Sequence, residues 1–352
     1  MQQLGSNQKE NEQEKNEIEQ FLFSHTGPIY DVRAPCEFKE GSIPTSFSLP
    51  LFSDQERHEV GLTYKQKGKK EAIALGLSFV GPRLASFASV FMAHEVVRIL
   101  CFRGGMRSSS MAWLASLSGC RVIRLEKGYK LYRHWVLQLI NTPFQALVFS
   151  GPTGSGKTEL LRLLQEKGEP VLDLEALARH RGSVFGGFEE YEQPTQENFE
   201  NEVAHALYPL LKKPYICVEA ESRTIGKKNL SSGVYTSIHS SPCLFVECSF
   251  EERLQRVVAD YGTKPEAILV QAVRKLERRL GGKRTSDIIS FLSSGRILEA
   301  ASLLLEYYDT TYEHCLRNHT GARISLPRKE IVDAISEGKF QELAHAVFTS
   351  RN

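Results

Sequence analysis

A cysteine, two arginines and two glycines lie together in residues 101–108, CFRGGMRS. Paired glycines let backbone N–H groups turn inward, and a helix that begins just after them presents the positive end of its dipole, so the stretch predicts an anion-binding loop. The same field favours thiolate over thiol, which makes Cys101 the predicted catalytic nucleophile. A thiol that only packs at a strand end is the alternative interpretation. The predicted loop residues are Cys101, Arg103, Gly104, Gly105, Arg107 and Ser108.

A second motif, residues 151–158, has the sequence GPTGSGKT and fits the pattern GxxxxGK[ST] in full. Its glycines allow the backbone to wrap an anion, Lys157 neutralises phosphate charge, and the hydroxyl of Thr158 suits Mg²⁺. The motif predicts a di- or triphosphate site, with or without nucleotide hydrolysis. A glycine-rich turn is the weaker alternative, because an apolar run precedes the motif and a helical pattern follows it. The predicted diphosphate-binding residues are Gly151, Gly154, Ser155, Gly156, Lys157 and Thr158.

Further polar residues follow the predicted strands and helix starts of the second half of the chain. Acids after the apolar run PYICV, or in VLDLE at Asp173 and Glu175, are candidates for a metal-linked carboxylate. The segment ESRTIG would face the crevice at the strand ends. Histidine and arginine at 180 and 181 suit phosphate or ribose contact, and a plain exposed loop stays equally open. The predicted supporting residues are His180, Arg181, Glu219, Glu221 and Arg223, and no metal ligand is assigned.

Alternating apolar runs and helical patterns surround both motifs. PIYDV, VVRIL and CRVIRL precede residue 137, and QALVFS, PVLDLE, PYICVEAE and CLFVECS begin at residue 145. This alternation predicts an α/β fold class with parallel sheets covered by helices. Residues 1–18 are too polar to fold, and Asn, Thr and Pro interrupt a helix near residue 141. The predicted domains are a disordered polar tail (1–18), a first α/β domain (19–138), a linker (139–144) and a P-loop domain with a C-terminal helical segment (145–352).

The composition is that of a globular protein, since 41% of the 352 residues are hydrophobic and 24% are charged. Seven cysteines without CxxC spacing argue against a disulfide framework and against a zinc site. No apolar run approaches the roughly 18 residues of a membrane span, and the first twenty residues lack a secretory signal. We therefore expect a cytoplasmic protein with no membrane partner.

A formal net charge of +2 leaves any attraction for nucleic acid to local clusters. Residues 264–284 hold seven Lys and Arg against two Glu, and leucines and valine recur at helical spacing from Leu269 to Leu280. We expect one helix that packs on its apolar side and ends at Gly281. Its basic side either binds an RNA backbone or is simply solvated, and the sequence leaves both open.

The segment DVRAPCEFKEGSIPTSFSLPLF, residues 31–52, is similar to the first signature of rhodanese-like domains, and Cys101 lies where their active-site cysteine lies. Four later segments extend the similarity: DLEALARHRGSVFG, EAESRTIG, LERRLGGKR and LLEYYDTTY. Together they resemble the family of tRNA 2-selenouridine synthases over nearly all of the chain beyond the tail. Two departures are Lys127, where the family pattern has Gly, and Ala220, which replaces an acid and weakens the case for a full magnesium site.

The resemblance implies a transferase that replaces sulfur by selenium in the wobble 2-thiouridine of tRNA. It implies an S-geranylated intermediate, with selenophosphate and geranyl diphosphate as co-substrates and Mg²⁺ as an optional ion. The loop of Cys101 would then take selenophosphate, and the loop of Lys157 the diphosphate. Two alternatives remain open: a phosphatase with the Cys-x5-Arg spacing of Cys101 and Arg107, and a non-catalytic adaptor that binds RNA or a nucleotide.

Overall fold

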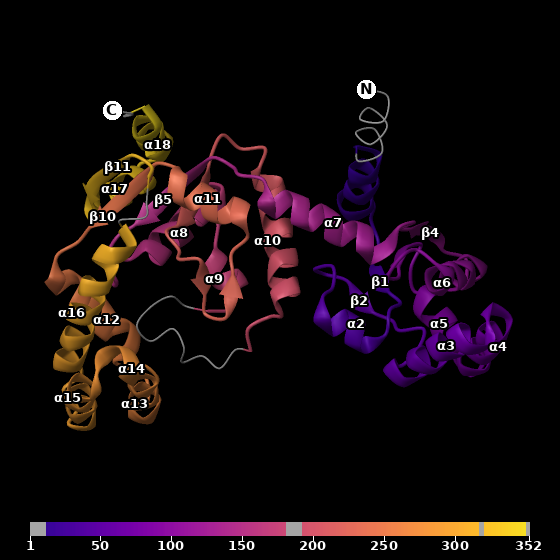
Figure 1. Cartoon of the computed structure of the whole chain (residues 1–352). Helices are drawn as coiled ribbons and strands as arrows, with labels where there is room; N and C mark the ends of the chain where they lie inside the picture. The colour runs from indigo at the N-terminus through magenta and orange to yellow at the C-terminus, as the bar shows by residue number, and fades with distance from the viewer. Residues whose placement is uncertain (1–11, 181–191, 317–319, 350–352) are drawn as a thin grey trace. The chain divides into compact units, whose positions relative to one another are not determined.

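The computed structural model describes residues 12–180, 192–316 and 320–349 (Figure 1). The chain divides into two compact units, Met1–Leu139 with Glu200–Glu202, and Ile140–Phe199 with Val203–Asn352. Each unit contains a parallel sheet and helices, which confirms the predicted α/β class. Helix α7 (Gly128–Asn141) runs through the division and ends inside the stretch predicted as a linker.

The sheet of the first unit has four parallel strands in the order β2-β1-β3-β4. Their bounds are β1 (Ile29–Asp31), β2 (Phe47–Ser48), β3 (Val96–Leu100) and β4 (Arg121–Arg124). Three of the four, β1, β3 and β4, lie in the predicted apolar runs. Asp31 pairs with Leu100, so the chain leaves β1 and β3 at the same edge of the sheet, where Cys101 follows.

The remaining elements of the first unit are helical. They are η1 (Gln20–Ser24), α2 (Pro35–Glu40), α3 (Asp54–Lys67), α4 (Lys69–Val80), η2 (Gly81–Arg83), α5 (Leu84–Phe91) and α6 (Met106–Leu117). Among the described residues, the stretch Lys69–Phe91 is long and apolar enough to cross a membrane by length and composition alone, with 17% of its apolar window buried. Residues 12–18 of the stretch predicted as a tail are helical, and Ile18 there is fully buried.

The sheet of the second unit has five parallel strands in the order β11-β10-β5-β7-β6. They are β5 (Ala146–Ser150), β6 (Val171–Leu172), β7 (Ile216–Glu219), β10 (Cys243–Glu247) and β11 (Arg323–Pro327). Every residue of β5 is buried, which agrees with a central strand. Strand β11 was not predicted, because its residues alternate in exposure at the edge of the sheet and form no continuous apolar run.

Helices and a short hairpin complete this unit (Figure 1). The helices around the sheet are α8 (Lys157–Glu166), α9 (Leu174–Leu177), α10 (Gln196–Leu210), α11 (Ser232–Ser240), α17 (Arg328–Ser336) and α18 (Phe340–Thr349). The hairpin pairs β8 (Thr224–Ile225) with β9 (Lys228–Asn229) in antiparallel fashion.

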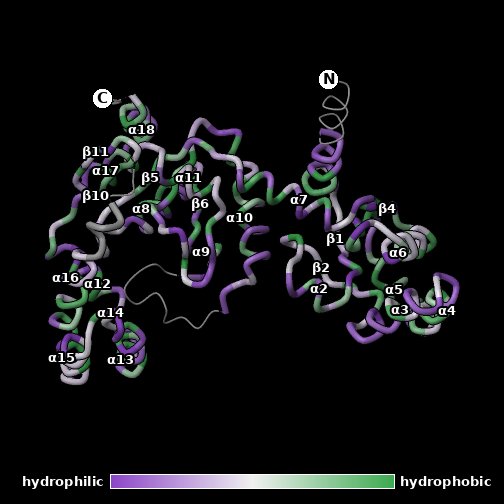
Figure 2. The backbone as a smooth tube through the Cα atoms, in the orientation of Figure 1, coloured by the Kyte–Doolittle hydropathy of each residue, from purple (hydrophilic) through white to green (hydrophobic). Residues whose placement is uncertain are grey.

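Five helices are inserted between the neighbouring strands β10 and β11, namely α12 (Phe250–Tyr261), α13 (Glu266–Lys275), α14 (Glu277–Leu280), α15 (Gly282–Ser293) and α16 (Ile297–Leu316). They have their own apolar core, which includes Val257, Val273 and Leu304. Hydrophobic and hydrophilic residues alternate along them in Figure 2. The basic stretch predicted as one helix is therefore two, broken at Leu276, and its apolar side is buried as expected.

Candidate functional site

The phosphate loop joins the end of β5 to the start of α8. Gly154 and Gly156 have φ angles of +81° and +84°, which L side chains rarely adopt. A Cβ at Gly156 would lie 2.8 Å from Nε of Arg328, so a larger residue here would displace that side chain in addition to straining the backbone. The side chain of Ser155 is buried, and its Oγ has no hydrogen-bond partner among the described residues.

Lys157 and Thr158 are both held by one carboxylate, that of Glu219 at the end of β7. The ammonium of Lys157 lies 3.4 Å from Oε1 of Glu219 and donates a hydrogen bond to the Gly151 carbonyl at 3.0 Å. The hydroxyl of Thr158 donates to Oε2 of Glu219 at 3.1 Å. The structure thus brings together predicted residues of the loop and of the strand end.

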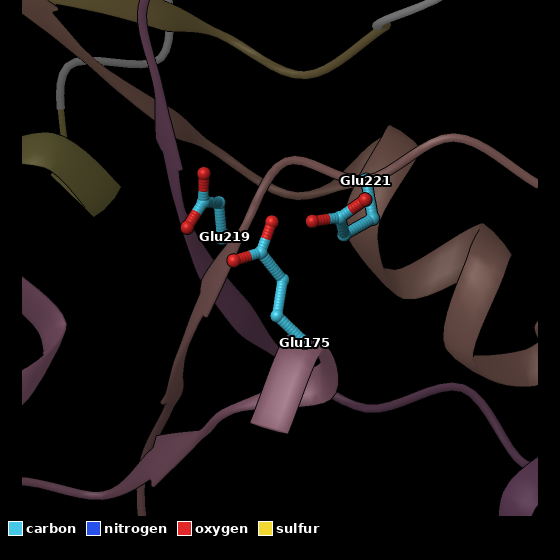
Figure 3. A group of neighbouring side chains, drawn as sticks. All are labelled: Glu175, Glu219 and Glu221. Atoms are coloured by element: carbon cyan, nitrogen blue, oxygen red, sulfur yellow. The ribbon is translucent and has the colours of Figure 1, made fainter. Parts of the chain in front are cut away.

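Three carboxylates, those of Glu175, Glu219 and Glu221, meet beside this pair. Their oxygens lie within 4.8 Å of one another, and Figure 3 shows the three groups pointing toward each other. Burial, and then the charges of Glu175 and Glu219, raise the pKa of Glu221 well above its ordinary value, while Lys157 acts in the opposite direction. Such crowding of acids is relieved by a cation, and hard oxygen donors suit Mg²⁺.

The role of Glu175 in this group was not singled out from the sequence. Its neighbour Asp173 does something else, since its carboxylate accepts a hydrogen bond from the Ala176 N–H at 2.9 Å and caps α9. The third acid of the group therefore comes from helix α9 rather than from position 220. Spacing within VLDLE was the only signal available, and it does not tell which of the two acids faces the sheet.

Two of the other predicted supporting residues, His180 and Arg223, have contacts outside this group. Burial lowers the pKa of His180, and its Nδ1 has no hydrogen-bond partner among the described residues. A Cβ at Gly226 would lie 2.6 Å from Cδ2 of His180, so the hairpin turn packs closely on this ring. The guanidinium carbon of Arg223 lies 4.9 Å from the ring centroid of Tyr235. Arg181 lies outside the described residues.

Arginines from distant parts of the chain, which the sequence motifs do not include, also hold the phosphate loop. Arg253 on α12 donates to the Thr153 carbonyl at 3.1 Å and forms a bidentate pair with Asp309 at 2.7 and 2.8 Å. Arg328 forms an ion pair with Glu159 of α8 at 2.5 Å. These contacts are tertiary, with no local sequence pattern to mark them, so only the structure finds them.

The first unit carries the cysteine loop between β3 and α6. Cys101 is 2% exposed, and its thiol donates to the Ser108 hydroxyl at 3.1 Å. Gly104 has a φ of +67°, and a Cβ there would lie 1.3 Å from the carbonyl oxygen of Glu126. The loop therefore closes over the sulfur only with glycine at position 104, which explains one of the two predicted glycines.

Arg107 is fixed by an acid from another element. It donates two hydrogen bonds to the carboxylate of Glu37, at 2.6 and 3.3 Å. Although burial acts against it, the bond and charge of Glu37, followed by the charge of Cys101, raise the pKa of Arg107 above its ordinary value. Arg103, by contrast, is exposed, with its guanidinium carbon 5.6 Å from the Phe102 ring centroid. Arg107 is thus the oriented cation of this loop.

A parallel five-stranded sheet whose central strand leads through GPTGSGKT into a helix defines a P-loop α/β protein. The family model for the tRNA 2-selenouridine synthase AAA domain matches residues 144–340. The chain belongs to the tRNA 2-selenouridine synthase family.

Relatives extend the similarity over both units. A tRNA 2-selenouridine synthase of Bordetella bronchiseptica is 36% identical, over 86% of this chain and 92% of that one. Those of Bdellovibrio bacteriovorus and a Sulfurovum species are 36% and 33% identical, and cover 83% and 82% of this chain and 89% and 88% of their own. The N-terminal domain of a Clostridium difficile 630 protein described as ATP/GTP binding is 39% identical, over 34% of this chain and 96% of that one, with a TM-score of 0.33.

Proposed function

We propose that this protein is a transferase that converts 2-thiouridine in tRNA to 2-selenouridine. The observation that supports it most is the presence, in one chain, of a glycine-closed cysteine loop and a complete phosphate loop, in a protein similar over most of its length to enzymes named for this product. A function that used only one of these loops would leave the presence of the other unexplained. The rhodanese-like character of the first unit is part of this proposal.

The first step is S-geranylation of the thiouridine by geranyl diphosphate. A bond forms from sulfur to C1 of the geranyl group, the base loses its N3 proton to solvent, the C1–O bond breaks, and its electron pair leaves with the diphosphate. Lys157 and the backbone N–H groups of the loop bind that diphosphate and stabilise the charge that develops on it. Mg²⁺ held by Glu175, Glu219, Glu221 and Thr158 would, when bound, supply further neutralisation of the same charge.

The second step introduces selenium from selenophosphate at C2 of the base. Selenium in selenophosphate already has the oxidation state of selenide, so forming a covalent Cys–Se carrier would require an oxidant. The proposed mechanism therefore has no Cys–Se intermediate. Instead, the thiolate of Cys101 attacks phosphorus: an S–P bond forms, the P–Se bond breaks, and selenide leaves with the electron pair. Selenide then bonds to C2 while the C2–S bond breaks and geranylthiol departs. Water hydrolyses the S–P bond, and Arg107 holds the phosphate throughout.

The direct test supplies purified protein with 2-thiouridine tRNA, selenophosphate and geranyl diphosphate, followed by mass spectrometry of the nucleosides. We expect S-geranyl-2-thiouridine when selenophosphate is omitted and 2-selenouridine when both are present. Thiolated tRNA that stays unaltered in the complete mixture contradicts the proposal.

The role of the phosphate loop is tested by Lys157→Ala. Loss of one positioned cation from a developing anion costs about 10²- to 10³-fold in rate, and we expect that loss in single-turnover geranylation. Lys167→Ala, at an exposed lysine just after α8, is the matched control and should geranylate at the wild-type rate. If Lys157→Ala geranylates at the wild-type rate, the proposal that this loop binds the diphosphate is wrong.

A further inference from the structure

A cavity of about 760 Å³ lies in the first unit, bordered by helices α3, α4, α5 and α6. Its volume falls within the range of about 300–1,000 Å³ that small-molecule sites occupy. The walls are almost wholly apolar, with Val60 from α3, Ile73 and Leu77 from α4, and Met111 and Leu114 from α6.

Large apolar side chains stay exposed around the cavity. Trp113 is 63% exposed, Leu77 65% and Tyr64 58%, and all three line it. Soluble proteins rarely leave such side chains side by side without a ligand or partner for them. The same side chains explain why the stretch Lys69–Phe91 is so apolar and yet so little buried.

The charged residues among the described lining of the cavity are all basic: Arg57, Lys65, Lys69 and Arg107. Glu37, outside the lining, pairs with Arg57 and Arg107, so the positive charge that it does not offset comes from Lys65 and Lys69. A purely hydrocarbon ligand would gain nothing from these groups, whereas a hydrocarbon chain with an anionic end would use both the walls and the rim.

Arg107 places this cavity beside the cysteine loop. It lines the cavity, and it is also the cation that Glu37 orients one turn after the loop closes over Cys101. A chain that occupies the cavity therefore has its charged end next to the loop in which the sulfur lies. That is where the proposed second step needs the geranyl group to be.

We infer that this cavity binds the hydrocarbon chain of a prenyl group whose other end is anionic, an inference that rests on the proposed function. Of the two sources of this chemistry, the S-geranyl group on tRNA is the one consistent with a donor diphosphate bound by the loop of Lys157, because phosphates of the tRNA then supply the charge at the rim. Geranyl diphosphate in this cavity would instead place the diphosphate of the donor beside Arg107. In either case the helices α3, α4 and α6 hold the chain, and the basic rim holds the anion.

Binding is tested without activity by the fluorescence of Trp113. The chain has two tryptophans, and Trp135 is only 4% exposed, so a ligand in the cavity should change the environment of Trp113 selectively. We expect geranyl diphosphate to shift the emission to shorter wavelength, inorganic diphosphate to leave it unchanged, and Trp113→Phe to abolish the shift. No shift, or one that survives in Trp113→Phe, overturns the inference.

A matched pair of variants separates the two sources. Leu77→Asp puts a carboxylate in the cavity, and Leu117→Asp puts one on α6 outside it, at leucines that are 65% and 69% exposed. For Leu77→Asp we expect about a tenfold loss of affinity for the prenyl ligand, and for Leu117→Asp none. A raised KM for geranyl diphosphate in geranylation identifies the donor as the occupant, and slower selenation of pre-geranylated tRNA identifies the tRNA-bound group.

Wild-type kinetics of both steps in Leu77→Asp overturn the inference and leave the proposed function intact. If wild-type protein makes no selenouridine at all, the proposed function fails, and the Trp113 titration still decides whether the cavity takes a prenyl chain. Emission that responds to anionic phosphatidylglycerol vesicles but not to geranyl diphosphate would assign the cavity to a lipid surface and overturn the prenyl assignment.

Discussion

At the scale of residues, each of the two loops has its key cation held by a glutamate. Glu219 accepts from Thr158 and lies 3.4 Å from Lys157, and Glu37 accepts two hydrogen bonds from Arg107. Both cations are thereby oriented before any anion arrives, at the cost that the anion competes with a carboxylate for Lys157. A preorganised charge stabilises a developing anion without reorganisation at the moment of reaction.

Cys101→Ser should separate the two proposed steps. Serine keeps the size of the side chain and its hydrogen bond to Ser108 but is a far poorer nucleophile, so we expect selenation to fall by about 10³-fold or more, as loss of a nucleophile does elsewhere. Geranylation should stay at the wild-type rate. Cys120→Ser, at a buried thiol away from the loop, is the control. Normal selenation by Cys101→Ser would exclude the thiolate from this step.

Glu221→Gln should change how stability depends on pH. Because the native pKa of Glu221 is raised, the native state binds this proton more tightly, and unfolding free energy is lost as pH rises from about 4.5 through the raised value. Glutamine removes that loss, so without metal the variant should melt a few degrees above wild type at pH 8 and close to it at pH 4. Mg²⁺ should stabilise wild type more than the variant.

Differential scanning calorimetry with and without Mg²⁺ measures both effects. Glu166→Gln, at an exposed carboxylate at the end of α8, is the control and should melt like wild type at each pH. If Mg²⁺ stabilises wild type and Glu221→Gln equally, Glu221 does not bind the cation.

At the scale of elements, the turn from β3 into α6 depends on one of its two glycines. Gly104 has a positive φ and no space for a Cβ, whereas Gly105 has an extended backbone and nothing within 4 Å of a Cβ. Arg124 also donates to the Gly104 carbonyl at 2.7 Å, which ties the turn to β4. The two adjacent glycines are equivalent in the sequence and different in the structure.

Gly104→Ala and Gly105→Ala therefore form a matched pair. Strain at a positive φ, together with the clash at Glu126, should cost at least about 2 kcal/mol in Gly104→Ala. Gly105→Ala should stay within about 0.5 kcal/mol of wild type. Thermal unfolding followed by circular dichroism measures the difference, and equal melting of the two variants would contradict this account of the turn.

Much of the element order was predictable, because buried parallel strands are continuous apolar runs. ALVFS, which is buried at every residue, shows this most clearly. The edge strand β11 was not predictable in this way, because its residues alternate in exposure. Both loops were found from their glycines and charged residues. Their tertiary supports Arg253 and Arg328 were not, because a contact between residues far apart in the chain leaves no local pattern. Glu175 was a candidate together with Asp173, and only the structure tells the two apart.

At the scale of the whole molecule, the two units offer different surfaces for one large substrate. The first carries the cysteine loop and the apolar cavity, and the second carries the phosphate loop and the basic helices α13 and α14. The basic side chains of those helices are exposed, as RNA contact requires. The sequence left RNA binding and simple solvation open for them, and an experiment decides between the two.

The double variant Arg274→Ala with Arg278→Ala tests that surface. If these exposed arginines contact phosphates, tRNA affinity should fall, and the slope of log K against log salt should shrink by about 1 per arginine. Filter binding at several salt concentrations measures it, with Lys212→Ala plus Lys213→Ala, at exposed lysines after α10, as the control. An unchanged slope would mean that these arginines are simply solvated and do not contact RNA phosphates.

The contact of Arg328 with the phosphate loop has a consequence for biosynthesis. Arg328 opens α17 directly after β11, yet its guanidinium pairs with Glu159 and fills the space beside Gly156. When the motif first emerges from the ribosome, Arg328 has not yet been synthesised. The phosphate loop therefore lacks one of its walls until some 170 further residues have been translated. Ligand capture should begin only near the end of translation, and premature termination upstream of β11 should yield a polypeptide with the motif intact but unable to retain diphosphate.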